Sequence, residues 1–182
     1  MTTPPSQGAT IWLTGLSGAG KSTIAEALLV RLRETGRRVD ILDGDEVRQV
    51  LTADLGFSRE DRITNVRRIG YVAEVLSRND VLTLVPVIAP YAEARDSVRE
   101  RHEKAGTPFV LIHVATSVEV CAERDVKGLY AKQRAGQMTG LTGVDDPYEE
   151  PHNPDLRLDT AGRTLDESVD AVWAVLSSRG LV

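Results

Sequence analysis

Residues 15–22 read Gly15-Leu-Ser-Gly-Ala-Gly20-Lys21-Ser22, and Thr23 follows them. This stretch matches the pattern G-x-x-x-x-G-K-[ST], in which glycines let successive backbone N–H groups turn inward around phosphate oxygens. An apolar run, Thr10–Thr14, precedes it, and a helix-forming run over Lys21–Thr35 follows it. A strand, a glycine-rich loop and a helix in this order predict a site for a nucleoside triphosphate.

The residue types of this loop have separate chemical tasks. We expect Lys21 to reach the β- and γ-phosphates of ATP as a mobile cation, and Ser22 to offer its hydroxyl to Mg²⁺. The N-terminus of the following helix adds a favourable dipole for the phosphates. The predicted ATP-binding set in the loop is Gly15, Ser17, Gly18, Ala19, Gly20, Lys21, Ser22 and Thr23.

Apolar runs alternate with helix-period segments along the rest of the chain, which is the pattern of a parallel sheet wrapped by helices. The run Val81–Ile88 is apolar on both faces, so we place it inside the sheet. The fold class predicted is α/β, a P-loop NTPase three-layer sandwich with a mostly parallel five-stranded sheet and helices on both faces. Strands are expected near Thr10–Thr14, Val39–Leu42, Val81–Ile88, Phe109–Val114 and Leu156–Leu158. Helices are expected over Lys21–Thr35, Glu46–Thr52, Asp61–Arg78, Ala92–Ala105, Ser117–Asp125 and from Thr164 to near Arg179.

Length and composition are those of one ordinary globular domain. The chain has 182 residues, and we expect residues 1–8 to be a flexible tail before a single domain over 9–182. The net charge of -5 argues against general binding to nucleic acid or to an anionic membrane. Cys121 is the single cysteine, which excludes an internal disulfide and a cysteine-based zinc site. With no apolar run of roughly 18 residues and no secretory signal, the cytoplasm is the expected compartment.

Two carboxylates are predicted at the end of the second strand. Asp43 and Asp45 follow Val39–Leu42, at the edge of the sheet where α/β folds bind their ligands. One carboxylate can organise Mg²⁺ or its waters, and the other can orient or deprotonate an acceptor hydroxyl. The alternative is a solvated turn in which Asp45 caps the next helix. Which of the two is the base stays open at this point, and we assign metal binding to Ser22 and Asp43.

Cationic and amide side chains gather in the sequence that follows. Arg48 lies three residues after Asp45, and Arg62 and Asn65 share a helix face in the same way. Guanidinium groups bind phosphate or sulfate oxygens with two parallel hydrogen bonds, so this local basic density predicts an anionic acceptor.

One other motif suggests a different class of protein. Asp159-Thr-Ala-Gly162 has the form of the D-x-x-G switch of small GTPases. It lies about 140 residues after the phosphate loop, too late for that role, and no N-K-x-D motif for guanine exists in the sequence. We therefore interpret it as the end of a strand and a turn before the last helix.

Six blocks of sequence, taken together and in order, strongly resemble adenylylsulfate kinases. The resemblance covers the chain from about Ile11 to Thr160 without large gaps, and the blocks as a set are far more specific than the phosphate loop alone. The blocks are Gly15-Leu-Ser-Gly-Ala-Gly-Lys-Ser-Thr23, Leu42-Asp-Gly-Asp-Glu-Val-Arg48, Gly56-Phe-Ser-Arg-Glu-Asp-Arg-Ile-Thr-Asn65, Arg67-Arg-Ile-Gly70, Arg124-Asp-Val-Lys-Gly-Leu-Tyr-Ala-Lys132 and Thr142-Gly-Val-Asp-Asp-Pro-Tyr-Glu149.

The resemblance implies a reaction. Such kinases transfer the γ-phosphoryl group of ATP to the ribose 3'-hydroxyl of adenosine 5'-phosphosulfate (APS), which gives 3'-phosphoadenosine 5'-phosphosulfate (PAPS) for sulfate assimilation. It implies a homodimer and a mobile lid over about 127–154, and a sulfurylase partner is left open. It also implies that Arg124 belongs to the ATP side and Lys127 to the catalytic and acceptor sides. The implied acceptor contacts are Asp45, Arg48, Phe57, Arg62, Asn65, Ile88, Lys127 and Leu141.

Three positions depart from the pattern of these kinases. Ala89 and Ala92 stand where they commonly have the serine and arginine of Ser-Pro-[Tyr/Phe]-Arg, and Leu141 stands where phenylalanine is usual. A kinase of the same scaffold with another anionic 5'-substituted nucleotide as acceptor is therefore the alternative. A non-catalytic nucleotide-binding partner of a sulfate-activating complex is a third hypothesis, which Lys21 and Asp45 count against. The alternative for Phe57 is a core aromatic, and for Glu149 and Glu150 we favour a solvated acidic turn.

Overall fold

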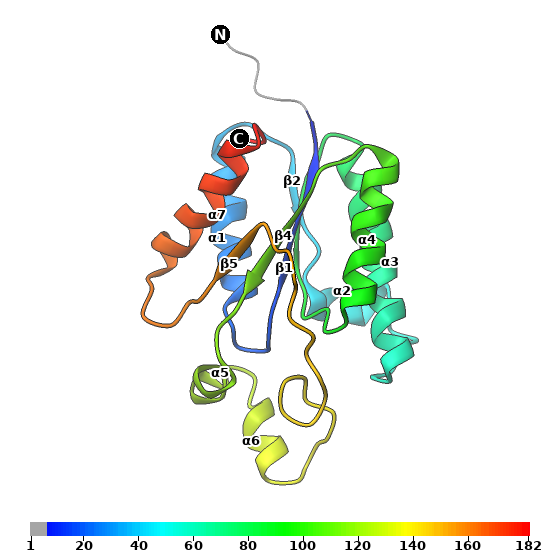
Figure 1. Ribbon diagram of the computed structural model, residues 1–182, viewed down its shortest axis with the longest axis vertical. Helices are drawn as coiled ribbons and strands as arrows, with labels where there is room; N and C mark the ends of the chain where they lie inside the picture. The colour runs from blue at the N-terminus through cyan, green and yellow to red at the C-terminus, as the bar shows by residue number, and fades with distance from the viewer. Residues whose placement is uncertain (1–6) are drawn as a thin grey trace.

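A sheet of five strands runs through the middle of the molecule in the order β2-β3-β1-β4-β5 (Figure 1). The computed structural model describes residues 7–182. All four pairings between neighbouring strands are parallel, where the sequence predicted a mostly parallel sheet. The strands are β1 (Ala9–Thr14), β2 (Val39–Ile41), β3 (Leu82–Pro86), β4 (Phe109–Val114) and β5 (Leu156–Leu158).

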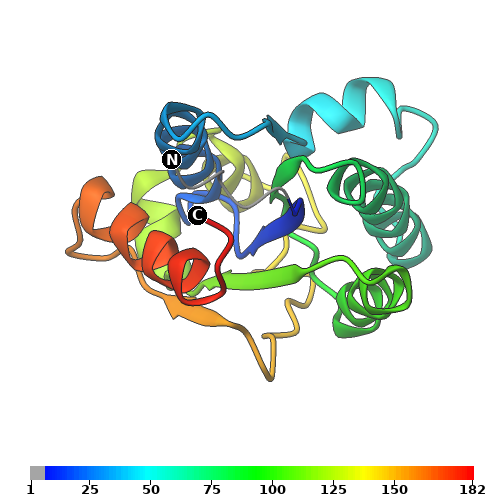
Figure 2. The same cartoon turned by 90° about the horizontal axis from the view of Figure 1, so that it is seen from above.

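Helices cover both faces of the sheet. Viewed from above, α1 and α7 lie on one side and α3 and α4 on the other (Figure 2). The short helices α5 and α6 lie beyond the end of the sheet where β1 leads into the phosphate loop (Figure 1). The helices are α1 (Lys21–Glu34), α2 (Gly44–Val50), α3 (Arg59–Ser77), α4 (Ala92–Ala105), α5 (Val118–Arg124), α6 (Leu129–Arg134) and α7 (Leu165–Ser178).

The central strand β1 shows why the strands read as continuous apolar runs. Ile11 pairs with Leu84 of β3 and Val110 of β4, and all three belong to the core on the α1 and α7 side. Its neighbour Trp12 points to the opposite face and packs in the core under α3 and α4. Because side chains alternate along a strand, a strand covered on both faces is buried at every position, and the two polar residues of β1, Thr10 and Thr14, are both hydrogen-bonded.

Side-chain caps fix where several helices begin. The Thr164 hydroxyl accepts a hydrogen bond from the backbone N–H of Glu167, and the Glu167 carboxylate accepts one from the backbone N–H of Thr164, so a capping box starts α7 where a helix was predicted to begin. The hydroxyls of Ser58 and Ser117 cap α3 and α5. Asp43 caps α2 through the backbone N–H of Asp45, so the cap role considered for Asp45 belongs to Asp43.

Several boundaries differ from the sequence predictions, and α2 is shifted two residues toward the N-terminus at both ends. Helix α3 begins two residues earlier than expected, because Ser58 is its cap, and β3 is shorter at both ends than Val81–Ile88. The segment after Lys127 contains α6, where we expected no regular structure. Both oxygens of Asp125 accept backbone N–H groups of the first turn of α6, so a side chain outside the helix starts it.

The predicted N-terminal tail falls largely outside the described residues, which begin at Gln7. The carbonyl of Gln7 accepts a hydrogen bond from Arg37, and Gly8 is buried, so these two residues are packed against the domain. Within residues 7–182, no helix has the length and apolar character needed to cross a membrane.

Candidate active site

The phosphate loop leaves the end of β1 and enters α1, as predicted. A Cβ at Gly15 would lie 2.3 Å from the carbonyl oxygen of Val114, so no larger residue fits there. Gly20 caps α1 with a φ of 104°, in the left-handed region that glycine adopts without strain. The loop therefore has its shape because of its glycines.

Donors from the chain's second half fasten this loop from outside. The Tyr130 hydroxyl donates to the carbonyl of Ser17 at 2.9 Å, and the Thr160 hydroxyl donates to that of Ala19 at 2.9 Å. Arg124 donates to the carbonyl of Gly18 and to both oxygens of Thr160. Arg124 was predicted on this side of the site, whereas Tyr130 and Thr160 were missed, since nothing in the local sequence signals a contact so distant along the chain.

Lys21 is a buried cation, with 8% of the residue exposed. Its ammonium group donates to the carbonyl of Leu16 at 2.7 Å. Burial, followed by repulsion from the Lys127 cation, lowers the pKa of Lys21 to about 8, and the carboxylates of Asp45 and Asp43 partly offset this. The charges of Lys127, Asp45 and Asp43 therefore all act on Lys21. The positive charge of Lys21 is only partly balanced by these carboxylates, which favours the binding of an anion.

Ser22 at the start of α1 and Asp43 at the N-cap of α2 lie side by side. The Ser22 hydroxyl donates to Asp43 Oδ2 at 2.9 Å. Hydroxyl and carboxylate oxygens are ligands that Mg²⁺ accepts beside waters and phosphates, so this pair fits a Mg²⁺ ion carried with ATP.

Asp45 and Lys127 form an ion pair between the first turn of α2 and the connection from α5 to α6. The Asp45 side chain is 67% exposed and the Lys127 side chain is 50% exposed. An exposed pair of this kind is weak, so an incoming anion or hydroxyl can compete with either partner.

Arg48 and Phe57 are packed together near this pair. The Arg48 guanidinium donates to the carbonyl of Gly56 at 2.7 Å and lies 4.8 Å from the ring centre of Phe57. Burial, followed by the charge of Arg62, lowers the pKa of Arg48. Phe57 is 72% exposed, so the alternative of a core aromatic is wrong and its ring is available for stacking.

The Arg62 guanidinium is engaged by the protein itself. It donates to the carbonyls of Phe57 and Gly140 and to the hydroxyl of Thr142, and it lies 3.6 Å from Asp146. Arg62 thus ties α3 to residues 140–146. On the same helix face, the Asn65 side-chain oxygen accepts a hydrogen bond from the Thr52 hydroxyl at 2.7 Å.

The two apolar residues predicted to face the acceptor have different environments. Ile88 is partly exposed just beyond β3, and its carbonyl accepts a hydrogen bond from the Thr14 hydroxyl. Leu141 is 5% exposed and belongs to the core cluster that contains Leu16 and Leu158.

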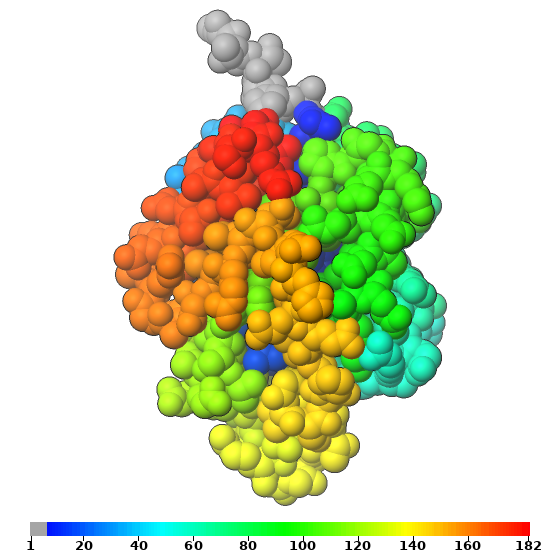
Figure 3. All heavy atoms as spheres, viewed as in Figure 1, coloured from blue at the N-terminus to red at the C-terminus, as the bar shows by residue number. Residues whose placement is uncertain are grey.

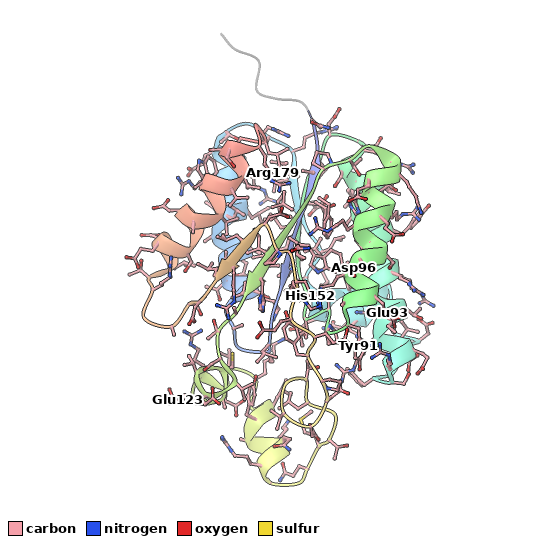
Figure 4. The ribbon with its side chains drawn as sticks, in the orientation of Figure 1. Tyr91, Glu93, Asp96, Glu123, His152 and Arg179 are labelled. Atoms are coloured by element: carbon pink, nitrogen blue, oxygen red, sulfur yellow. The ribbon has the colours of Figure 1, made fainter. Side chains whose placement is uncertain are left out.

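Glu149 corrects the sequence interpretation of a solvated acidic turn. Its carboxylate accepts the backbone N–H of Ala92 at 2.7 Å and so caps α4, where the side chain of Tyr91 provides no cap. The contact fastens the turn at Ala89, whose φ of 47° is in a region unfavourable for residues with a Cβ. Figure 4 shows Tyr91 and Glu93 at this end of α4. No hydrogen bond or ion pair of the Glu150 side chain occurs in the described part, as expected.

A cavity of about 610 Å³ lies beside the phosphate loop, between residues 113–119 and residues 143–150. Leu16 lines it, together with His113 and Tyr148. Figure 3 shows blue atoms of the N-terminal part of the chain at the bottom of a hollow between green and orange atoms. Neither Lys21 nor Asp45 lines the cavity, so it is distinct from the place where phosphoryl transfer is predicted.

The strand order and the phosphate loop define a nucleotide-binding protein of the P-loop class. Residues 7–159 match the family described as "Adenylylsulphate kinase", which is most of the chain. The chain belongs to this family, and its activity is the ATP-dependent phosphorylation of APS to PAPS.

Individual relatives agree with this assignment over nearly the whole chain. The "Adenylyl-sulfate kinase" of Rippkaea orientalis is 54% identical over 176 residues, which cover 96% of this chain and 94% of that protein. The Mycobacterium tuberculosis APS kinase CysC, in complex with AMPPNP and APS, is 47% identical with a TM-score of 0.91, covering 95% and 99% of the two chains. A hexameric APS kinase from Thiobacillus denitrificans is 42% identical with a TM-score of 0.76, covering 99% of this chain and 31% of that one. The differences at Ala89, Ala92 and Leu141 therefore do not set the chain apart from the family.

Proposed function

We propose that the chain transfers the γ-phosphoryl group of ATP to the ribose 3'-hydroxyl of APS between the phosphate loop and Asp45. Lys21 neutralises the β- and γ-phosphates, and the loop amides orient them for attack in line with the leaving ADP oxygen. Asp45 accepts the proton of the 3'-hydroxyl as the new P–O bond forms and the bond to ADP breaks. The observation that carries this proposal is the mutual influence of Lys21, Asp45 and Lys127 within one cluster of charges.

Ser22 and Asp43 would hold Mg²⁺ brought by ATP, since their oxygens already lie within hydrogen-bond distance of each other. When bound, Mg²⁺ would neutralise charge that develops on the transferring phosphoryl group. This assignment leaves Asp45 as the base, because Asp43 is occupied by Ser22 and by the cap of α2.

The acceptor is proposed to lie against α2, α3 and the end of β3. Phe57 would stack on its adenine, Ile88 would contact it from the opposite side, and Leu141 would support this wall from the core. Arg48, Arg62 and Asn65 would bind its polar groups, and Lys127 would leave Asp45 to contact its anionic groups. Arg62 has to release part of its bonds to residues 140–142 for this, which couples acceptor binding to that segment.

We further propose that residues 127–154 form a lid on a single kinase domain over 9–182. A lid would exclude water, which otherwise competes with the 3'-hydroxyl for the phosphoryl group. A homodimer is also proposed, and the hexameric relative from Thiobacillus denitrificans supports self-association in the family. Light scattering of the purified chain tests the dimer.

An acceptor screen tests the proposed reaction. ADP release is followed with MgATP and, in turn, APS and several other 5'-substituted adenine nucleotides. We expect turnover with APS, a product phosphorylated at the 3' position, and loss of turnover in Lys21→Ala and Asp45→Ala. Turnover with another nucleotide in preference to APS, or activity that survives Asp45→Ala, would contradict the proposed placement.

A further inference from the structure

Two segments that are far apart in the sequence are bonded to each other beside the proposed acceptor. We call residues 88–92 the acceptor turn, since they follow β3 and contain Ile88, and residues 146–149 the strap. The turn contains Ala89, whose left-handed backbone has a φ of 47°. A residue with a Cβ remains in this conformation only where its surroundings hold it. The contacts that do so come from the strap and from α4.

Glu149 binds the acceptor turn through its side chain and its backbone. Its carboxylate accepts the N–H of Ala92 at 2.7 Å, and its own N–H donates to the carbonyl of Pro90 at 2.8 Å. The second carboxylate oxygen lies 3.6 Å from Arg59, whose guanidinium stacks on the ring of Tyr91 at 4.1 Å. The turn is thereby held at three successive residues.

Arg95 joins the turn and the strap from the first turns of α4. It is 2% exposed, and its two terminal nitrogens donate to the carbonyl of Ala89 at 2.6 Å and to that of Glu149 at 2.5 Å. A planar guanidinium can bond two carbonyls at once with fixed geometry, which an ammonium group cannot. Arg95 therefore fixes the carbonyl of the strained residue relative to the strap.

A third connection runs through Thr14 at the end of β1. The Thr14 hydroxyl donates to the carbonyl of Ile88, and its oxygen lies 3.0 Å from the hydroxyl of Tyr148. Since the single hydroxyl hydrogen of Thr14 is used toward Ile88, Tyr148 is the donor in this second bond. The carbonyl of Ile88 is thus linked to the strap by two hydrogen bonds in series.

We infer that Glu149 and Arg95 are positioning residues for the acceptor, because they hold the acceptor turn in the shape that places Ile88 against APS. This inference rests on the proposed contact between Ile88 and the acceptor. Neither residue belongs to the ATP side of the site. Loss of their bonds should therefore weaken the use of APS and leave the use of ATP unchanged.

Steady-state kinetics on four variants test the inference, with KM measured separately for APS and for ATP. Glu149→Ala removes the cap of Ala92, and Glu149→Asp keeps the charge but withdraws the carboxylate by one methylene. Glu150→Ala is the matched control, because its side chain makes no hydrogen bond or ion pair within residues 7–182. Ile88→Ala tests the acceptor contact itself.

We expect Glu149→Ala to raise the KM for APS about tenfold, since small displacements of positioning groups cost up to about a hundredfold. Glu149→Asp should give a smaller rise, Glu150→Ala none, and the KM for ATP should stay within about twofold throughout. If Glu149→Ala does not fold, Glu149→Asp decides by the same comparison.

Two results would overturn the inference: an unchanged KM for APS in the Glu149 variants, or equal rises for APS and ATP. If Ile88→Ala also leaves the KM for APS unchanged, the proposed acceptor placement fails. If Ile88→Ala raises it while the Glu149 variants do not, the placement stands and only the positioning role is lost.

Discussion

Replacement of Lys21 by methionine is expected to stabilise the protein while it removes ATP binding. Methionine keeps most of the length of lysine and carries no charge, so the buried site no longer has to accommodate a poorly compensated cation. The penalty on that cation is large. A pKa lowered from 10.5 to about 8 corresponds to roughly 3 kcal/mol against the charged form in the folded protein.

Part of this gain is offset by the lost hydrogen bond from Lys21 to the carbonyl of Leu16, about 1 kcal/mol. The net expectation is therefore about 2 kcal/mol of added stability at pH 7. The difference in the free energy of unfolding between Lys21→Met and wild type should narrow as the pH rises from about 8 to about 10.5. In that window the unfolded wild-type chain keeps the lysine proton and the folded chain releases it, so wild-type stability rises with pH.

Urea denaturation of both proteins at several pH values between 7 and 10 measures this effect. Addition of MgATP at about a hundred times its dissociation constant should stabilise the wild type by about 2.7 kcal/mol and the Lys21→Met variant by little. The exposed residue Lys132 provides the control. Lys132→Met should change neither the free energy of unfolding nor the stabilisation by MgATP. A Lys21→Met variant that is less stable than wild type at pH 7, or a difference that does not depend on pH, would refute this reasoning.

Three further changes test other parts of the structure. Asp45→Asn should lower kcat by about 10²- to 10⁴-fold in the APS assay with little change in the KM for ATP, because the base is lost and the phosphate loop is intact; a loss below tenfold contradicts the role. Gly70→Ala should destabilise the protein by about 1–3 kcal/mol in urea, since the new Cβ would lie 2.4 and 2.8 Å from the γ-carbons of Val98, and Val98→Ala in the same chain should recover part of this. Equal stability of Gly70→Ala and wild type would show that α3 and α4 can separate at no cost. Arg62→Lys should speed hydrogen exchange across residues 140–146, because an ammonium group cannot hold the acceptors of that segment and of Phe57 together; unchanged exchange would mean that Arg62 does not anchor it.

Most of the fold could be predicted because its signals are local. The phosphate loop needs its glycines, Lys21 and Ser22 within eight residues, and the central strands β3 and β4 are buried at every position because helices cover both faces of the sheet. Caps such as Thr164 and Glu167 also act within one helical turn. The position of Asp43 and Asp45 followed from the rule that ligands bind at the carboxyl ends of parallel strands.

The missed features depend on contacts between distant parts of the chain. Glu149 lies 57 residues from the N–H group that it caps, and only the folded chain brings it to α4. Its sequence neighbourhood of acidic residues and prolines is typical of an exposed turn, which is what Glu150 provides. The short helix α6 has only six residues, too few for an amphipathic period to be recognised, and its start is fixed by the side chain of Asp125.

The acceptor side was the least predictable part of the site. Arg62 has the residue type and helix face of an anion ligand, yet its bonds to residues 140 and 142 make it a link between α3 and the proposed lid. Leu141 was grouped with the acceptor contacts by resemblance, and it is packed in the core beside Leu16. Side chains that are shared between a ligand and a mobile segment cannot be assigned from sequence patterns, because both uses favour the same residue types.

The most direct test of the proposed reaction is a crystal structure with an unreactive ATP analogue, Mg²⁺ and APS bound together. We predict that the pair between Lys127 and Asp45 is broken, with the Asp45 carboxylate about 2.6–3.2 Å from the ribose 3'-hydroxyl and that hydroxyl facing the γ-phosphate. A complex in which Asp45 stays paired with Lys127 while the 3'-hydroxyl lies against another residue would contradict the role given to Asp45.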